Sequence, residues 1–472
     1  MITQKTTLVD ISKEKSLRYD VDYIKFHQTH VNNYLSFDDL FSIAPSRTCT
    51  EDELYRDFLY CEIGDSDKDG GISPVALNFE DRNLENENYY KKIENGDIMP
   101  VDLDDILISK VRPNLKKYVR ITEDKRDVYF TTAFIKLKAK EMPSVLYYCL
   151  RSVFYSDLMA IARQGKGYPT ISEKDLHTLR FDETIVEKLR ANYESIREEI
   201  VKIEQRIAEK ASSIMPMQGI IDTAFQREFN FDYERFNELK SEKHYTSHQS
   251  FFSNNPDLRF SAKFHRPAGE FVMEQLTGIT NKKIKHYISE PIVLGASVSP
   301  SDYDENGEYY YISMATIKTW EFDESSASLV SDRYSAERTA KTVQKDDIIL
   351  ARSGEGTIGK VAIISDDTNG IFADFTMRIR LNTDIYNPTF AYYYMRSCYF
   401  QYLVEIYKKG LGNNTNIFPA VIQEFPIPDI SIDEQQRIVD EIQSEMVEQD
   451  NIRAEIAALR SQIDSIIEKT II

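Results

Sequence analysis

The chain has 472 residues, of which 42% are hydrophobic, so it is long and apolar enough to fill several cores. Its formal net charge of −19 argues against a protein that simply coats nucleic acid, because phosphate contact needs Lys and Arg. The four cysteines form no CxxC pair, the amino terminus has no apolar signal segment, and no apolar run reaches membrane length. We therefore expect a cytoplasmic protein without disulfides or structural zinc.

The first half, residues 1–181, alternates short β-type runs with turns and then changes to helical spacing. DILISKV (105–111) and TAFIKLKAK (132–140) are typical strands. The helical stretch 144–163 follows and ends at an exposed turn, GKG (165–167). These features predict one mixed α+β domain. Residues 31–110 sum to −12 and residues 111–180 to +7, so an acidic chain can still have a basic face here.

A long helix is predicted next, from about Thr184 to Ile214, within a segment that we bound at 182–218. Its apolar positions alternate in steps of three and four, which is the a/d seam of a coiled coil, with Lys210 as a polar break. The seam comprises Val186, Leu189, Tyr193, Ile196, Ile200, Ile203, Ile207 and Ile214. Pro216 and Gly219 end the pattern.

The second half, residues 219–430, repeats the order of the first. The strand candidates are KDDIILARS (345–353), KVAIISDD (360–367) and FTMRIRLN (375–382), followed by a helical stretch at 388–407 and the turn GLG (410–412). GEGTIGKV (354–361) fits phosphate-loop spacing, but a strand rather than a helix follows it, so we predict a tight turn between strands. YNPTF (386–390) lacks the second proline of an adenine-methyltransferase loop, and we expect it to start a helix.

A second long helix is predicted from about Asp433 to the end of the chain, within a segment 431–472. Glu445 is the polar break in its seam, and Pro426 and Pro428 fix an extended approach to it. The seam comprises Ile438, Ile442, Gln449, Ile452, Ile456, Leu459, Ile463 and Ile466. Two matched helices in one chain can pair antiparallel and act as a rigid spacer between two globular domains.

The two halves are related by a repeat of about 245 residues. Residues 147–170 and 392–415 share nine of 24 positions without gaps, including Arg151 with Arg396. DILISKVRPNLKKYVRI (105–121) corresponds to DIILARSGEGTIGKVAII (347–364). The predicted fold class is therefore α+β, with two tandem mixed α/β domains joined by two long antiparallel coiled-coil helices.

Basic and polar side chains gather at corresponding turns of both halves, where we expect them to contact DNA through base edges or phosphates. The candidates in the first half are Lys110, Arg112, Lys116, Lys117, Arg163, Lys166 and Tyr168. Those in the second half are Arg352, Ser353, Lys360, Lys408, Lys409, Asn413, Asn414 and Thr415. No catalytic motif and no metal-ligand spacing is recognisable, so a non-catalytic protein is predicted.

Duplicated domains, each closed by a G-x-G…T turn and followed by a heptad helix, resemble the specificity subunit of type I restriction–modification systems. KKGLGNNTNIFPAVIQEFPIPDISIDEQQRIVDEI (408–442) and DIILARSGEGTIGKVAII carry the resemblance, with GKGYPTISEKDLHTLRF and DETIVEKL as weaker counterparts in the first copy.

The resemblance implies that each half is a target recognition domain for one part of a bipartite double-stranded DNA site. It also implies that the helices set the gap and bind two DNA methyltransferase subunits, with a restriction and translocase subunit joining the complex. Docking is then expected at Val186, Leu189, Tyr193, Ile196, Ile438, Ile442, Ile456 and Leu459. S-adenosylmethionine, ATP and magnesium would belong to the partners. The alternatives are a related methylation-based phage-defence system without a restriction nuclease, and a coiled-coil scaffold that reads no DNA.

Overall fold

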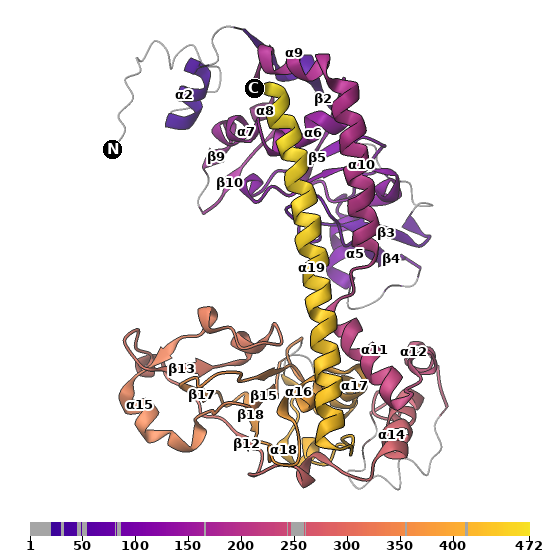
Figure 1. The fold of residues 1–472 in the computed structure, drawn as a ribbon, viewed down its shortest axis with the longest axis vertical. Coiled ribbons are helices and arrows are strands. Elements are labelled where there is room, and N and C mark those ends of the chain that lie inside the picture. The colour runs from indigo at the N-terminus through magenta and orange to yellow at the C-terminus, as the bar shows by residue number, and fades with distance from the viewer. Residues whose placement is uncertain are drawn as a thin grey trace. The chain divides into compact units, whose positions relative to one another are not determined.

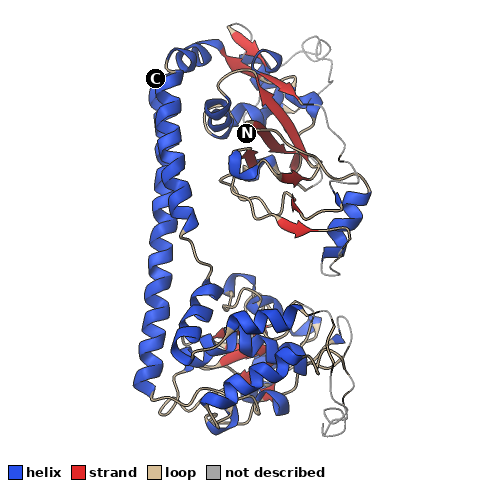
Figure 2. Ribbon diagram, turned by 90° about the vertical axis from the view of Figure 1, so that its right-hand side faces the viewer, coloured by secondary structure: helices blue, strands red, loops and turns tan. Residues whose placement is uncertain are grey.

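Each half of the chain builds the same pair of sheets. The computed structural model describes residues 20–29, 33–44, 49, 54–80, 82, 86–164, 167–242, 244–246, 259, 261–354, 356–410 and 414–472. These form two units: unit 1 is Met1–Ser213 with Arg453–Ile472, and unit 2 is Ile214–Ile452. Both combine helices with sheets (Figures 1 and 2), so the predicted α+β class with tandem domains is confirmed.

In unit 1 a four-stranded sheet has the order β2-β8-β5-β6, and a three-stranded sheet has the order β4-β3-β7. The strands are β2 (Phe41–Ile43), β3 (Phe58–Cys61), β4 (Val75–Leu77), β5 (Asp105–Ser109), β6 (Tyr118–Arg120), β7 (Val128–Phe130) and β8 (Phe134–Ala139). The five residues of β5 are all buried, which explains why its sequence is a continuous apolar run rather than an alternating one.

Unit 2 repeats this topology strand for strand, with sheets β12-β18-β15-β16 and β14-β13-β17. The strands are β12 (Val293–Leu294), β13 (Tyr309–Ile312), β14 (Leu329–Val330), β15 (Ile348–Ala351), β16 (Val361–Ile363), β17 (Gly370–Phe372) and β18 (Thr376–Ile379). A parallel strand pairing recurs as well, β3 with β7 in unit 1 and β13 with β17 in unit 2. The predicted internal repeat is therefore confirmed.

Two helices follow the last strand of the four-stranded sheet in each unit, β8 in unit 1 and β18 in unit 2. Unit 1 has α6 (Pro143–Arg151) and α7 (Tyr155–Ile161), and unit 2 has α16 (Pro388–Arg396) and α17 (Cys398–Tyr407). Both α6 and α16 begin at a proline, whose missing N–H costs nothing in the first turn. YNPTF does start a helix, because Asn387 accepts hydrogen bonds from the N–H groups of Thr389 and Phe390.

Shorter elements complete the units. Unit 1 adds α2 (Val21–Thr29), β1 (Tyr34–Ser36), α3 (Phe37–Leu40), α5 (Glu87–Glu94), η2 (Pro113–Leu115), η3 (Glu123–Lys125), β9 (Arg163–Gln164), β10 (Pro169–Thr170), α8 (Glu173–Leu176) and β11 (Arg180–Asp182). Unit 2 adds α12 (Tyr233–Ser241), α14 (Pro267–Ile279), η4 (Ile284–His286), η5 (Pro300–Asp302), η6 (Met314–Ile317), η7 (Glu324–Ser326), α15 (Asp332–Glu337), η8 (Thr339–Lys341) and α18 (Pro419–Ile422).

The first predicted long helix is interrupted, and the second is continuous. The predicted helix 184–214 consists of α9 (Glu183–Ala191) and α10 (Tyr193–Ser212), because Asn192 leaves helical geometry and its side chain binds the carbonyl of Lys188. Pro216 then separates α10 from α11 (Met217–Phe229). By contrast, α19 (Ile432–Ile471) runs for 40 residues without a break.

Within unit 1, α10 and the end of α19 lie antiparallel (Figure 1). Lys188 of α9 donates to the carbonyl of Ile471 at 2.7 Å, and Lys210 near the end of α10 forms an ion pair with Glu455, so the α9–α10 segment and α19 run in opposite directions. The seam between them is buried in the unit 1 core and includes Ile196, Ile200, Ile203, Leu459 and Ile463.

Within unit 2, α11 takes the corresponding place against the beginning of α19. Arg437 pairs with Glu228 at 2.6 Å, and Gln449 accepts a hydrogen bond from the N–H of Met215 at 2.8 Å. Ile438 and Ile442 belong to the unit 2 core rather than to a seam with α10. None of the described helices is both long and apolar enough to cross a membrane.

Candidate nucleic-acid interface

In unit 1 the strand turn after β5 and the glycine turn after α7 form one composite surface. The N–H of Ile171 donates to the carbonyl of Lys110, and the N–H of Arg112 to that of Pro169, both at 2.9 Å. Val111 and Thr170 form a β-bridge between these two bonds. The structure thus brings together two basic clusters that lie about 55 residues apart in the sequence.

Arg112 and Tyr168 face solvent on this composite turn. The guanidinium of Arg112 lies 5.2 Å from the centre of the Tyr168 ring, and the tyrosine is 43% exposed. Stacking on a ring holds a guanidinium plane without using its hydrogen-bond donors. Lys110 is less available, since its ammonium donates to the carbonyl of Thr132 at 2.7 Å.

Unit 2 builds the same composite turn. The N–H of Ile417 donates to the carbonyl of Arg352 at 2.9 Å, and Ser353 bridges Asn416, as Val111 bridges Thr170. Arg352 also donates from Nε to the carbonyl of Asp374 at 3.1 Å, in the manner of Lys110. Its guanidinium lies 5.8 Å from the ring centre of Phe418. The predicted correspondence between the two glycine turns therefore extends to individual hydrogen bonds.

The second turn is closed by a short backbone pair. The N–H groups and carbonyls of Lys409 and Asn416 bond each other at 2.8 and 2.7 Å, and Gly410 between them has φ of +111°. This conformation is accessible to glycine and strained for other residues. Lys409 and Asn414 are exposed at the turn. Lys166 and Asn413, which we also predicted to contact DNA, lie outside the described residues.

Two predicted contacts, Ser353 and Thr415, are each only 7% exposed. The hydroxyl of Ser353 donates to the carbonyl of Thr415 at 3.1 Å, while Thr415 Oγ1 is buried without a hydrogen-bond partner. The structure therefore gives both side chains a place inside the turn and not on its surface.

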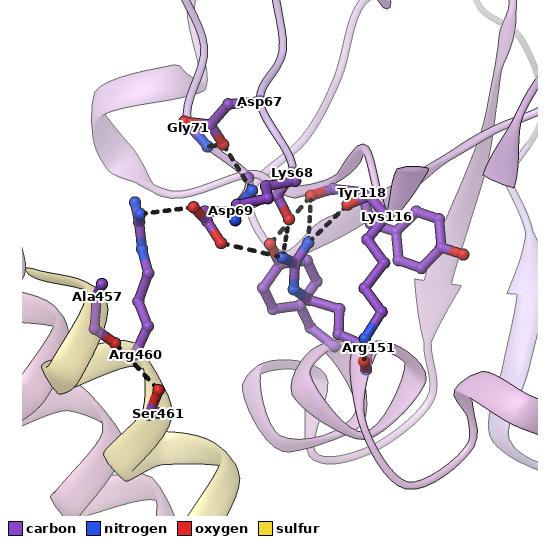
Figure 3. Close-up of polar contacts among 12 residues, drawn as sticks. Asp67, Lys68, Asp69, Gly71, Lys116, Tyr118, Arg151, Ala457, Arg460 and Ser461 are labelled. Atoms are coloured by element: carbon purple, nitrogen blue, oxygen red, sulfur yellow. Dashed lines mark hydrogen bonds and ion pairs between the residues drawn. The ribbon is translucent and has the colours of Figure 1, made fainter. Parts of the chain in front are cut away.

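Lys116 and Lys117 bind the protein's own carbonyls, contrary to a free DNA-contacting role. Lys116 donates to the carbonyl of Arg151 at 2.9 Å, and Lys117 to that of Ile63 at 2.8 Å. Figure 3 shows the network around Lys116: Arg151 donates to the carbonyls of Lys116 and Tyr118.

The same network reaches α19 inside unit 1. Asp69 lies between Arg151 and Arg460, and its oxygen is 2.9 Å from the Arg460 guanidinium (Figure 3). These charges hold the loop after β3 against the helix. The basic character of residues 110–120 thus serves internal packing at Lys116 and Lys117 and a surface role at Arg112.

Three further residues that we predicted to contact DNA form ion pairs or hydrogen bonds within their own unit. Arg163 pairs with Asp175 at 2.8 Å, and Lys408 with Glu405 at 2.6 Å. Lys360 donates to the carbonyl of Lys318 at 2.7 Å, beside Trp320. GEGTIGKV forms the predicted turn between β15 and β16, so its lysine is part of the scaffold.

The sequence analysis missed the aromatic side chains of the second turn. Phe375 is 47% and Phe418 43% exposed, and the carbonyl of Phe375 accepts from the N–H of Arg352 at 3.0 Å. A search for charged residues passes over them, although exposed phenylalanines next to a cation are a usable signal for a nucleobase platform.

The seam residues predicted to bind partners contact the chain's own cores. In unit 1 the exposure is at most 4% for Val186, Leu189, Ile196, Ile456 and Leu459. Ile438 and Ile442 are 1% exposed in unit 2, and Tyr193 is half-buried against the unit 1 core. The apolar seam is therefore used within the chain, which leaves the outer helix faces for any partner.

No catalytic constellation emerges in the described residues. No group of three or more His, Cys, Asp or Glu side chains converges there in a way that could hold a metal ion. Burial raises the pKa of the Cys61 thiol to about 12, so at neutral pH this cysteine is a protonated core residue and not a nucleophile.

Comparison with known families bears on the second half of the chain. Residues 291–458 match the model of the "Type I restriction modification DNA specificity domain". The resemblance to a type I specificity subunit is confirmed. The matched stretch contains Arg352, Phe375, Lys409, Asn414 and Phe418, and so the whole composite turn of unit 2.

Solved structures from type I systems are similar over most of the chain. A structure described as "Structural basis underlying complex assembly and conformational transition of the type I R-M system" is 16% identical, with 93% of this chain and 97% of that chain covered and a TM-score of 0.40. The HsdS subunit from Thermoanaerobacter tengcongensis is 16% identical (93% and 95% covered, TM-score 0.34). The S subunit from M. genitalium is 14% identical (93% and 97%, TM-score 0.40). Comparison with curated proteins gives no match.

Proposed function

We propose that this chain is the DNA-recognition subunit of a type I restriction–modification complex, and that each unit reads one part of a bipartite target. The observation that carries the proposal is the duplicated composite turn: both units join the same strand to the same post-helical turn and place an arginine beside an exposed ring. The specificity-domain match over residues 291–458 supports it.

Recognition would be direct readout in the major groove, where the four base pairs present different donor and acceptor patterns. Arg112 and Tyr168 would approach base edges from unit 1. Arg352, Lys409 and Asn414 would do so from unit 2, with Phe375 and Phe418 excluding water around them. The internally bonded lysines would fix the shape of the turns, leaving phosphate binding to be shared with partner subunits.

Two DNA methyltransferase subunits would dock on the outer faces of α10, α11 and α19, and a restriction and translocase subunit would join for cleavage. These faces are rich in charge and free of the buried seam, as at Glu198 and Glu199 on α10 and at Glu448 and Asp450 on α19. S-adenosylmethionine, ATP and magnesium would act in the partners. The adenine to be modified would be flipped into a methyltransferase pocket.

The test is methylome sequencing of cells with and without the gene and its neighbouring methyltransferase gene. We expect one split motif that depends on this chain. Exchanging residues 244–428 for the corresponding segment of another specificity subunit should change one half of the motif only. A scaffold that reads no DNA would leave the methylome unchanged, and a change in both halves would contradict the assignment of one half-site to each unit.

A further inference from the structure

Arg112 has a backbone conformation that arginine seldom adopts. Its φ is +52°, in the left-handed region, and the conformation is fixed on both sides: its N–H donates to Pro169 and its carbonyl accepts from the N–H of Leu115, both at 2.9 Å. Backbone strain of this kind persists only where the surroundings impose it, and it is concentrated at functional sites. Lys116 in the same strand turn shares this conformation at φ of +53°, but its side chain binds the carbonyl of Arg151, whereas that of Arg112 leaves the composite turn for solvent.

The guanidinium of Arg112 is held but not neutralised. It lies over the Tyr168 ring, and within the described part of the chain no carboxylate forms an ion pair with it. Other described arginines, among them Arg206 and Arg352, also form no ion pair, so Arg112 is distinguished by its exposure, its neighbouring ring and its fixed left-handed backbone together. Its neighbours behave differently, since Arg120 pairs with Glu204 at 2.7 Å and Arg163 with Asp175 at 2.8 Å.

A planar fork of donors, fixed by stacking and available to an external acceptor, matches the two acceptors O6 and N7 that guanine presents in the major groove. Unit 2 lacks this arrangement. In the equivalent turn, Arg352 Nε donates a hydrogen bond to the carbonyl of Asp374. The exposed rings of Phe375 and Phe418 lie beside this turn.

We infer that Arg112, positioned by Tyr168, reads a guanine in the half-site of unit 1, and that unit 2 reads its half-site by a different set of contacts. This inference rests on the proposed function. It assigns a base-reading role to one residue and a positioning role to another, and it requires a guanine in one particular half of the target.

The experiment uses the full chain and fluorescein-labelled duplexes that carry the motif found by methylome sequencing, together with duplexes substituted at each position in turn. Affinities are measured by anisotropy at several salt concentrations. Arg112→Asn keeps the left-handed backbone, which asparagine tolerates, and Arg112→Lys keeps the charge without the fork. Arg112→Asn should abolish the preference for guanine at one position of one half-site, a loss of discrimination of roughly ten- to a hundredfold, and Arg112→Lys should weaken that preference.

Tyr168→Ala should lose part of the same preference and Tyr168→Phe should keep it. Arg126→Gln is the matched control, because Arg126 is also exposed but pairs with Glu123 at 2.7 Å, and it should leave every affinity unchanged. Thermal melts of each variant establish that it is folded.

Three results would overturn the inference while leaving the proposed function intact. These are a unit 1 half-site without guanine, full discrimination in Arg112→Lys, or an equal loss on every duplex with a shallower salt dependence. The last result would identify a phosphate contact. If the wild-type chain selects no sequence at all, the proposed function itself is wrong.

Discussion

Arg380 donates to both carboxylate oxygens of Asp347, each at 2.7 Å, although Asp347 is only 1% exposed. Asp105 holds the same place in unit 1, where its Oδ2 accepts from the N–H of Asp102 as Asp347 Oδ2 accepts from that of Gln344. The remaining oxygen of Asp105 is buried without a partner. In unit 2, therefore, both oxygens of the buried carboxylate accept hydrogen bonds, whereas in unit 1 only one oxygen of the equivalent carboxylate does.

Asp347→Asn should destabilise unit 2. Breaking a buried ion pair costs about 3–5 kcal/mol, and we expect about 2–3 kcal/mol here because Arg380 keeps Glu290 at 2.6 Å. The single tryptophan, Trp320, lies in unit 2, so urea unfolding followed by its fluorescence measures this change. An unchanged fluorescence midpoint would contradict the prediction.

Asp105→Asn should have the opposite effect in unit 1. Burial raises the pKa of Asp105 above its ordinary 3.8, so the folded state favours the protonated acid. Stability from this group is complete below about pH 3.8 and declines as the pH rises through the raised pKa. Asparagine cannot ionise, so the variant should gain stability relative to the wild type as the pH rises above about 3.8.

Far-UV circular dichroism at several pH values checks the Asp105 prediction, with Trp320 fluorescence as the internal control for unit 2. The dichroism midpoint should rise relative to the wild type while the fluorescence midpoint stays constant. A variant less stable than the wild type at neutral pH would show that Asp105 is stabilising when charged.

The repeat and the heptad seams made much of this fold predictable from the sequence. In the sequence, the matches of Gly165 with Gly410 and of Arg151 with Arg396 predict which turns are equivalent. The polar breaks in the seams were visible but unexplained: Lys210 pairs with Glu455, and Gln449 donates to Glu445 at 3.0 Å. These partners lie on another helix or one turn away, and a one-dimensional pattern cannot choose between such possibilities.

The candidate interface was less predictable, because the sequence of a turn does not show whether a basic side chain faces solvent or binds a carbonyl of the protein itself. Lys116 and Arg112 are four residues apart and both have left-handed backbones, yet one binds the carbonyl of Arg151 and the other faces solvent. The interruption at Asn192 was equally hidden, since the spacing of apolar positions continues through it.

Gln449 is expected to fix how α11 meets α19 in unit 2. It is 4% exposed and accepts the N–H of Met215, where the chain passes from one helix to the next. Gln449→Ala should cost about 1 kcal/mol, since that N–H loses its partner. Tryptophan fluorescence under urea measures the loss, and Ser444→Ala on the exposed face of α19 should be neutral. Equal unfolding midpoints of the two variants would show that the hydrogen bond of Gln449 does not stabilise the contact between α11 and α19.

Gly410→Ala should damage the recognition turn of unit 2. A methyl group at this position meets the carbonyl oxygen of Asn414, and φ of +111° is strained for alanine. We expect a loss of about 1–3 kcal/mol in unit 2 and weaker binding of its half-site alone. Gly278→Ala in α14 has no neighbour within 4 Å and serves as the control with little effect. Undiminished binding of the unit 2 half-site by Gly410→Ala would remove this turn from the interface.

The last prediction concerns the helices as a spacer. Deleting residues 196–202 removes one heptad of α10 and the buried Ile196 and Ile200, but Ile203 and Ile207 follow in the same phase. Unit 1 can then meet α19 one heptad earlier, with Ile452 and Ile456 in place of Leu459 and Ile463. Seven residues of helix span about 10.5 Å, or roughly three base pairs of DNA.

The methylated motif of this variant should therefore keep both half-sites and lose about three base pairs from the gap between them. Stability should also fall, because Glu204 and Arg460 no longer meet Arg120 and Asp69. Deleting only residues 196–200 is the control, since five residues rotate the following seam by about 140° away from α19, and no active protein is expected. A motif with an unchanged gap after the seven-residue deletion would show that these helices do not set the spacing.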